Sequence, residues 1–568
     1  MNPFIEPISE FIWDTKYRYR LHNNVIDNDI ENTWWRVANG IAQAEKYPLR
    51  KLWAQNFLDI LHDFRFLPGG RILAGTNTQY QVTLFNCYVM GKIKDSIPGI
   101  FTALQQGALT LQQGGGVGYD FSTLRPHGSN TDNNGGIASG PVSFMRIWDA
   151  MCATMQSTGA RRGAMMAVLR CDHPDIEEFI AAKADAKELR HFNVSVAVTD
   201  AFMRAVHDDT DWPLVFKQQV SKYIRARKLW EQMMQSAYDY AEPGILFIDT
   251  INRLNNLRYC EHIAATNPCG EVPLPSYGAC DLGSINLTQF VSDAFTPQAR
   301  LNWHGIEAVA ATAIRLLDNV IDISNYPLKA QQNSAQHTRR IGLGFTGMAD
   351  MLIMLGIRYG STESLNMIQK ITQTIRDISW DTSISLAAEK GSCPAYDAKK
   401  YLQGEFVKTL PEAIRSALKH NGVRNSHHNV IAPTGTISLL ANNISSGLEP
   451  IFATCYNRHV LTSEGSTKTF VANNYTYNLW RKLHKAPTLP PAWIDAQSLN
   501  VEDHLAVLHA VQPYIDGAIS KTIFIPKTYP YEMFKNTYLN AYALNFKGCT
   551  VFRDNAITGN VLSVCPMC

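Results

Sequence analysis

The sequence predicts a large α/β protein, in which strands and helices alternate to form either a barrel or a wound sheet. One observation is length, since 568 residues exceed what a single small hydrophobic core can organise. A second is the alternation of short apolar runs with longer segments of helical periodicity over most of the chain. A third is that the sequence contains no internal repeat and no low-complexity tract.

Charge and composition exclude several classes of function. The 52 lysines and arginines nearly balance 50 aspartates and glutamates, the formal net charge is +2, and no long run of one sign occurs. This balance argues against a nucleic-acid-binding surface. The N-terminal segment carries acidic residues and no apolar signal region, and no span of about 18 apolar residues occurs. We therefore expect a cytoplasmic protein that does not insert into a membrane.

The first 70 residues predict a helical region that packs against the rest of the chain. Trp34, Val37 and Ile41 recur at about 3.6-residue spacing. A Gly-rich turn at residues 67–70 ends this region, and residues 71–76 predict a buried strand.

The α/β pattern then continues along the chain. We expect strands at residues 83–90, which include Cys87, and at residues 194–198. Apolar periodicity predicts packing helices at residues 228–240 and 306–323.

The segment Asn267-Pro268-Cys269-Gly270-Glu271 has the clearest chemical character. Pro268 and Gly270 argue against a helix, so Cys269 is expected on a tight loop tip. Side chains two apart in an extended segment share a face. Asn267, Cys269 and Glu271 are therefore expected to point at one substrate.

Three loops are candidate ligand sites. Residues 113–120 form a Gly-rich run that follows neither standard phosphate-binding pattern. Residues 158–166 place adjacent arginines, Arg161 among them, at the tip of a glycine-flanked loop, although a solvated charge is the commoner explanation. Residues 431–438 predict a strand, a hydroxyl-rich turn and a helix start, a pattern that can bind phosphate.

The eleven cysteines do not form the framework of a small secreted domain, because their number is odd and they are scattered. Cys565 and Cys568 form a CxxC motif at the C-terminal end. A structural zinc needs four ligands and this motif supplies two. We therefore favour an electron carrier that works by thiol–disulfide exchange and predict no metal site. Six further cysteines are assigned to packing by default, at positions 152, 171, 260, 393, 455 and 549.

These motifs resemble those of ribonucleotide reductase catalytic subunits. The stretch NPCGEVPLPSYGACDLGSINL is similar to the family's finger-loop region, in the version typical of the adenosylcobalamin-dependent class II enzymes. Further stretches support the resemblance, among them FLPGGRILAG, GGGVGYDFSTLRPHG, APTGTISLLANNISSGLEP and KGCTVFR. It extends from about residue 66 to residue 568 and implies a ten-stranded α/β barrel around a central finger loop.

The resemblance implies a set of catalytic roles. Cys269 becomes a thiyl radical that abstracts the 3′ hydrogen of the ribose, Glu271 takes the 3′-OH proton, and Asn267 holds the sugar hydroxyls. Cys87 and Cys280 deliver two electrons and close into a disulfide. Cys565 and Cys568 reopen that disulfide and are themselves reduced by a thioredoxin- or glutaredoxin-type protein.

Substrate and effector positions also follow from the resemblance. The substrate phosphates are expected on Pro433, Thr434, Gly435, Thr436 and Ser438, and Arg161 on the loop that touches the base. Asp95, Ser96 and Arg125 fall in the region that binds a deoxynucleotide or ATP effector, at the contact of a possible homodimer.

Two absences point to the class II cofactor. Class I enzymes receive a radical from a partner subunit through paired tyrosines, but the corresponding stretch, residues 549–553, has Phe552 and no tyrosine. The glycyl-radical motif of the anaerobic class is also missing. Adenosylcobalamin is therefore the expected cofactor. The rival hypotheses are a class I subunit with an unusual relay and an inactive nucleotide-binding regulatory relative.

Three parts of the chain are expected. Residues 1–70 form the helical region, residues 71–545 the barrel with effector elements at about 90–170, and residues 546–568 a flexible tail with the CxxC motif. The short N-terminal region leaves no room for an ATP-binding regulatory cone.

Overall fold

The computed structural model describes residues 3–22, 24–130, 136–155, 163–185, 187–461, 467–485, 488–553 and 562–564. The chain divides into two compact units. Unit 1 comprises residues 1–86, 279–521 and 560–568, and unit 2 comprises residues 87–278 and 522–559. Within the described ranges, no helix is both long and apolar enough to cross a membrane.

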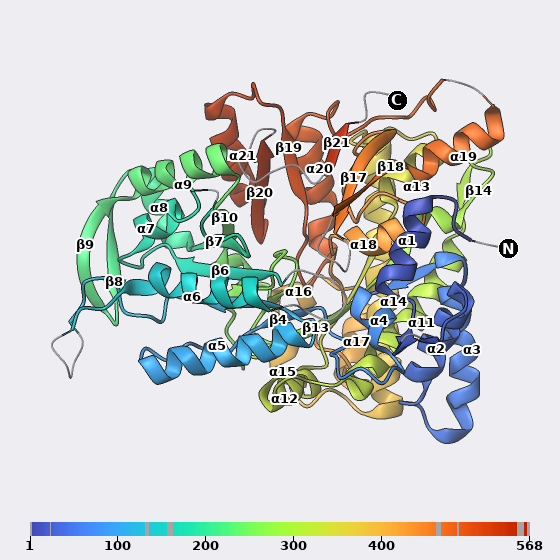
Figure 1. Cartoon of the computed structure of the whole chain (residues 1–568), viewed down its shortest axis with the longest axis horizontal. Coiled ribbons are helices and arrows are strands. Elements are labelled where there is room, and N and C mark those ends of the chain that lie inside the picture. Colours follow the sequence, from blue (N-terminus) through green and yellow to red (C-terminus); the bar gives the residue numbers. More distant parts are fainter. Residues whose placement is uncertain are drawn as a thin grey trace. The chain divides into compact units, whose positions relative to one another are not determined.

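Helices form the N-terminal part of unit 1, drawn in dark blue in Figure 1. Asp29 caps the second of them, because its side chain accepts a hydrogen bond from the Asn32 amide. The predicted N-terminal helical region is therefore confirmed. Its helices are α1 (Pro7–Lys16), α2 (Ile30–Ala42), α3 (Arg50–Leu61) and the short α4 (Gly70–Gly75).

The strand predicted at residues 71–76 is wrong, because this segment forms α4. Arg71, Ile72 and Leu73 are all buried. A short apolar run fits a buried helix as well as a buried strand, so periodicity alone could not separate the two. The strand of this region lies just before it, as β3 (Phe66–Pro68).

The sheet of unit 1 is built around β13 (Ala279–Asn286). This strand pairs antiparallel with β3 and parallel with β16 (Ile341–Thr346), and all its residues are buried. Parallel bridges from Leu343 to Asn429 and from Ile431 to Ile519 extend the sheet. Helix α11 (Trp303–Ile323) packs on both β13 and β16, as expected for a helix that connects parallel strands.

The remaining elements of unit 1 surround this sheet. The helices are α12 (Lys329–Thr338), α13 (Met348–Met354), α14 (Thr362–Lys390), α15 (Ala398–Tyr401), α16 (Glu405–Lys408), α17 (Glu412–Asn421), α18 (Gly435–Leu440), α19 (Tyr475–His484) and α20 (Val501–Val511). The strands are β1 (Arg20–Leu21), β2 (Asn24–Val25), β14 (Val291–Ser292), β15 (Arg300–Leu301), β17 (Cys455–Leu461), β18 (Thr467–Asn473) and β21 (Leu562–Val564).

Unit 2 contains a sheet of seven described strands. Their order is β4 (Cys87–Val89), β5 (Gly116–Asp120), β6 (Met165–Arg170), β7 (Phe192–Val198), β10 (Gly244–Phe247), β20 (Gly548–Arg553) and β19 (Thr522–Ile525). Neighbouring strands are parallel except for the antiparallel pair β10 and β20. Most of these strands are buried over nearly their whole length, as parallel sheets covered by helices require.

Helices and two hairpins complete unit 2. The helices are α5 (Ile97–Gln112), α6 (Gly140–Thr154), α7 (Ile176–Ala181), α8 (Asp200–Asp208), α9 (Ala226–Tyr240), α10 (Ile248–Arg253) and α21 (Tyr531–Ala543). The hairpins are β8 (Asp211–Phe216) with β9 (Gln219–Arg225), and β11 (Ala265–Thr266) with β12 (Pro273–Leu274). The α/β class is thus confirmed. The closure of ten strands into one barrel stays a prediction.

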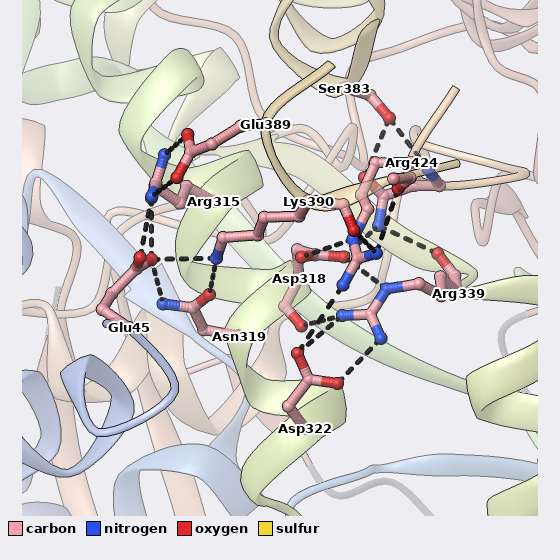
Figure 2. Close-up of polar contacts among 12 residues, drawn as sticks. Glu45, Arg315, Asp318, Asn319, Asp322, Arg339, Ser383, Glu389, Lys390 and Arg424 are labelled. Carbon is pink, nitrogen blue, oxygen red and sulfur yellow. Dashed lines mark hydrogen bonds and ion pairs between the residues drawn. The ribbon is translucent and has the colours of Figure 1, made fainter. Parts of the chain in front are cut away.

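A buried ion network ties the N-terminal helices of unit 1 to α11 (Figure 2). Glu45, which follows α2, is 3% exposed and receives two hydrogen bonds of 2.7 Å from the Arg315 guanidinium. Asn319 and Lys390 also donate to Glu45, at 2.8 and 3.0 Å. Burial raises the pKa of Glu45, but the hydrogen bonds from these three residues outweigh burial and lower it to about 2.

A second cluster lies one turn further along α11 (Figure 2). Asp318 has no exposed surface and accepts hydrogen bonds from Arg339 at 2.8 Å and Arg424 at 3.2 Å. Arg339 also pairs with Asp322 at 2.8 Å. Both clusters neutralise buried charges that would otherwise be costly to desolvate.

Asp281 on β13 is a buried acid in a different situation. It has no exposed surface, and neither carboxylate oxygen has a hydrogen-bond partner in another described residue. Burial raises the pKa of Asp281 well above its ordinary value, and the nearby charge of Asp318 adds to the shift. The folded protein therefore retains this proton to a higher pH than the unfolded chain does.

Glu45→Ala is expected to lower the free energy of unfolding by about 3 kcal/mol, because it leaves the buried Arg315 without one of its carboxylates. The folded pKa of Glu45 lies below its ordinary value of 4.5, so its contribution is lost as the pH falls from 4.5 to about 2. Urea unfolding at several pH values measures this difference. Asp14→Ala, which removes a more exposed partner of Arg18 and Arg20, is the control and should cost less than about 1 kcal/mol. Equal losses in the two variants would contradict the importance of the network.

Asp281→Asn is expected to flatten the dependence of stability on pH. Because the folded pKa of Asp281 is raised, its contribution to stability is complete below the unfolded pKa and is lost as the pH rises toward the folded pKa. Between the unfolded and the folded pKa of Asp281, the free energy of unfolding of the variant should rise relative to that of the wild type by up to about 1.4 kcal/mol for each pH unit. Denaturant unfolding at about pH 5 to 8 tests this. Parallel stability profiles would show that Asp281 titrates normally.

Candidate active site

A short hairpin in unit 2, residues 265–274, carries Cys269 at its tip. Its strands β11 and β12 pair antiparallel. The Gly270 amide donates to the Asn267 carbonyl at 3.1 Å, which closes a turn with Pro268 and Cys269 as its central residues. Gly270 has a φ of +79°, a conformation that suits glycine. Cys269 therefore lies on a tight loop tip, as the sequence predicts.

The expectation of an extended segment with three side chains on one face is wrong. Asn267 and Glu271 are 1% and 2% exposed, whereas Cys269 is exposed. The physical reason is Pro268, whose fixed φ suits the second position of a turn. The turn separates Cys269 from the two polar residues on either side of it.

Asn267 and Glu271 meet at Cys87 on β4. The Asn267 Nδ2 donates to the Cys87 Sγ at 3.1 Å, and the Cys87 thiol donates to the Glu271 Oε1 at 3.8 Å. Cys87 is 6% exposed, so all three side chains are buried together. An amide, a thiol and a carboxylate thus form a connected polar cluster beneath the hairpin tip.

The orientation of the Asn267 amide is fixed by its neighbours. Its Oδ1 accepts hydrogen bonds from the Val272 amide at 3.0 Å and from the Thr266 hydroxyl at 3.2 Å. Because both are donors, they identify the oxygen side of the amide. The Nδ2 is therefore the group directed at Cys87.

Two residues that hold the hairpin were not singled out from the sequence. A Cβ atom at Gly118 on β5 would lie 1.8 Å from the Thr266 carbonyl oxygen, so only glycine allows this approach. The Asn193 Nδ2 on β7 donates to the Pro268 carbonyl at 2.7 Å. The Gly-rich run at residues 113–120 was a signal for Gly118, although its role is close backbone packing.

Cys280 lies in unit 1, on the buried strand β13. It has no exposed surface, and its thiol donates to the Asp281 carbonyl at 3.4 Å. Cys87 belongs to unit 2. The pairing of Cys87 with Cys280 therefore stays a prediction.

The predicted phosphate loop in unit 1 is a cluster of hydroxyl groups. Thr434 and Ser438 are buried, and their hydroxyl oxygens lie 2.7 Å apart. Thr346, the last residue of β16, lies 2.9 Å from the Thr434 hydroxyl and 3.3 Å from that of Ser438. The Gly447 amide donates to Thr434 at 3.1 Å.

The rest of this loop is more open. Pro433 and Gly435 are half-buried, Thr436 is exposed, and a Cβ atom at Gly435 would meet nothing within 4 Å. Thr346 and Gly447 are additions to the predicted set. Gly447 follows two adjacent serines, Ser445 and Ser446, which are a sequence signal that could have found it, whereas Thr346 ends an ordinary apolar run.

The predicted effector residues gather at the start of α5 in unit 2. Ser96 caps the helix by accepting a hydrogen bond from the Gly99 amide at 3.2 Å. Asp95 accepts hydrogen bonds from the Arg125 side chain and backbone, both at 3.1 Å, and from Lys217 at 3.1 Å. Burial raises the pKa of Asp95, but these hydrogen bonds outweigh it and hold the pKa below its ordinary value.

Three of the predicted site residues, Arg161, Cys565 and Cys568, lie outside the described residues.

The remaining cysteines divide into several kinds. Burial raises the pKa of Cys171, Cys393 and Cys549 to about 12 in each case and that of Cys152 to about 11, in keeping with packing thiols. The packing assignment is wrong for Cys260, which is exposed, and for Cys455, which is disulfide-bonded.

Gly118→Ala is expected to lower the free energy of unfolding by about 3 kcal/mol, because the added Cβ overlaps a backbone oxygen that cannot move aside alone. Guanidinium unfolding measures the loss. Gly548→Ala is the matched control on β20, where the added Cβ would lie 3.0 Å from the nearest atom and should cost about 1 kcal/mol or less. A Gly118→Ala protein as stable as this control would mean that the hairpin can shift freely.

Comparison with known proteins adds an independent finding. Residues 4–81 match the family model "Ribonucleotide reductase, all-alpha domain", and residues 85–552 match "Ribonucleotide reductase, barrel domain". The chain is 37% identical to the vitamin B12-dependent ribonucleoside-diphosphate reductase of Mycobacterium tuberculosis over 531 residues, which cover 90% of this chain and 73% of that protein.

Two further relatives span most of the chain. The vitamin B12-dependent ribonucleoside-diphosphate reductase of Thermoplasma acidophilum is 34% identical over 98% of this chain and 72% of its own length. The alpha subunit of the Chlamydia pneumoniae ribonucleoside-diphosphate reductase is 24% identical over 92% of this chain and 57% of its own length. With both family models matched and a relative above 30% identity over most of both chains, this chain belongs to the ribonucleotide reductase family.

Proposed function

We propose that this chain reduces ribonucleotides to 2′-deoxyribonucleotides, the precursors of DNA, by a thiyl-radical mechanism that depends on adenosylcobalamin. The family match supports the reaction, and the names of the Mycobacterium and Thermoplasma relatives support vitamin B12 dependence and a diphosphate substrate. The observation that carries the proposal is the exposed Cys269 between Asn267 and Glu271 in the chain, two residues that meet at the buried Cys87.

The hairpin tip fits the approach of a bulky cofactor. Cys269 is exposed, and a Cβ atom at Gly270 would meet nothing within 4 Å. Adenosylcobalamin supplies, when bound, the carbon radical that takes the hydrogen atom of a thiol. Cys269 is the thiol proposed to receive this chemistry and to abstract the 3′ hydrogen of the ribose.

The buried cluster suits the steps that follow. Glu271 accepts the 3′-OH proton, and the Asn267 amide holds the sugar hydroxyls. Cys87 and Cys280 each contribute one electron and one hydrogen, so that the 2′-OH leaves as water and a disulfide forms. Because the Cys87 thiol already donates toward Glu271, a proton can pass between these two groups.

A second proposal concerns the phosphates of the substrate. Pro433, Thr434, Gly435, Thr436 and Ser438 are proposed to bind them through hydroxyl and backbone donors. The clustered hydroxyls of Thr434 and Ser438 and the open space at Gly435 support this assignment. Arg161, outside the described residues, is proposed to contact the base.

Regulation is proposed at the start of α5. Asp95, Ser96 and Arg125 are proposed to bind a deoxynucleotide or ATP effector. Helix α5 exposes Ile97, Phe101 and Leu109 with exposed fractions of 60%, 49% and 41%, an apolar surface that a second copy of this chain could cover. A homodimer with the effector at its contact is the proposed arrangement.

Re-reduction is proposed to use the C-terminal CxxC motif. Cys565 and Cys568 exchange with the disulfide left by Cys87 and Cys280, and a thioredoxin- or glutaredoxin-type protein then reduces them.

The alternative function is a class I catalytic subunit that works with a separate radical-generating subunit, and the Chlamydia relative is likewise named as a subunit of its reductase. Such a subunit needs a chain of redox-active side chains. Phe552 on β20 packs edge-on against Phe524, with ring centroids 6.1 Å apart, and neither ring carries a hydroxyl. This pair favours a radical generated at the site itself.

Cys269→Ala is expected to abolish deoxynucleotide formation by the purified chain supplied with adenosylcobalamin, a ribonucleoside diphosphate and dithiothreitol. Loss of the thiol removes the hydrogen-abstracting group but leaves nucleotide binding intact. Product analysis and equilibrium dialysis measure the two properties. Cys260→Ala, at another exposed cysteine of the described residues, is the control and should retain activity. Reduction by Cys269→Ala would overturn the mechanism, and activity that requires a separate radical-generating subunit would favour class I.

A further inference from the structure

The hairpin tip can adopt two turn geometries, and only one is present. In a turn closed by Gly270 and Asn267, type I and type II forms differ by a flip of the central peptide, between Pro268 and Cys269. Type II requires a positive φ at the third position, and Cys269 is not among the residues with positive φ. The Pro268 carbonyl therefore has the orientation found in type I.

This orientation decides where the Cys269 thiol points. The flipped form requires a positive φ at Cys269, which is strained for a residue other than glycine. It also reverses the Pro268 carbonyl and turns the Cys269 amide, so the backbone that carries the thiol is set differently in the two forms. Hydrogen abstraction needs the reacting atoms near contact distance and aligned. The two peptide orientations are therefore not equivalent for the chemistry.

Asn193 is placed to select one orientation. Its Nδ2 donates to the Pro268 carbonyl at 2.7 Å. Strand β7 is buried at every position except Asn193, and it is held between β6 and β10 by parallel pairing, with Asn193 opposite Met166. The donor thus stands on a rigid strand, while its acceptor lies on a turn that could otherwise flip.

We propose that Asn193 is a positioning residue that fixes the peptide between Pro268 and Cys269 and thereby aims the Cys269 thiol at the substrate. The inference rests on the proposed role of Cys269. Loss of the donor leaves the Pro268 carbonyl free to rotate, so the thiol samples unproductive directions. Nucleotide binding is unaffected, because Asn193 contacts the hairpin backbone.

The test compares Asn193→Ala and Asn193→Asp with the wild-type protein. Aspartate keeps the shape of the side chain but replaces the donor by an acceptor that repels the Pro268 carbonyl. Both variants should lose turnover on the order of 10²-fold in kcat, the effect of a small misplacement of reacting groups, with KM changed less than about twofold. In the protein without cofactor, hydrogen exchange of the segment 265–274 should rise while other segments match the wild type.

Asn252→Ala provides a matched control in unit 2. The Asn252 amide donates to the backbone carbonyls of Ile248 and Ile263 at 3.0 and 2.9 Å, so its loss removes comparable hydrogen bonds away from the tip. This variant should keep its kcat within about threefold of the wild type even where its stability falls. An equal loss of kcat in Asn252→Ala, or near-normal kcat in Asn193→Ala, would overturn the inference.

Different results would contradict the proposed function and the positioning role of Asn193. Turnover by Cys269→Ala would overturn the proposed function whatever Asn193 does. Unchanged hydrogen exchange of the segment 265–274 in Asn193→Ala would overturn the positioning role alone.

Discussion

The arrangement of unit 1 depends on buried charges along one face of α11. Asp318 and Asn319 come three and four residues after Arg315, and Asp322 comes four and three residues after them, so these side chains lie toward one side of the helix (Figure 2). Their partners come from the segment after α2, the end of α14 and the residues before β16. Because a buried charge without its partner is costly, these segments can dock only together. The strand that follows, β16, ends at Thr346 beside the proposed phosphate loop. Charge pairing far from that loop thus sets its position.

Much of the fold could be predicted from the sequence, because its signals are local. The amphipathic periods of α9 and α11 and the apolar run of β7 depend only on which residues face a core. The predicted strand at residues 71–76 failed because a short apolar run such as Ile72–Ala74 fits either kind of element. Partners of the buried ions, such as Glu45 and Arg315, are 270 positions apart. No local pattern links such residues, so this network could not be predicted.

The candidate site likewise combines residues that the sequence predicts with residues that it does not. Cys269 and Glu271 are recognisable from the sequence because their chemistry and the bracketing Pro268 and Gly270 lie within five residues. The family resemblance implied catalytic roles for Cys87 and Asn267, but the hydrogen bond between them was not predicted. The Gly-rich run drew attention to Gly118 but not to its role, and nothing in the sequence pointed to Asn193, because both residues act on backbone carbonyls far away in the chain. The missed residues are therefore those that place the reactive groups, whereas the groups themselves were identified.

The close approach of Gly118 to the Thr266 carbonyl decides which substitutions this part of the chain can accept. The hairpin is held by contacts to its main chain, at Thr266 from β5 and at Pro268 from β7. Main-chain oxygens are present whatever the side chain, so these two contacts depend on the residues of the supporting strands and not on the side chains of the hairpin. Position 118 tolerates no side chain, while position 266 is free of this particular requirement. The position of the hairpin is thus set in part by a surface that its own side chains do not encode.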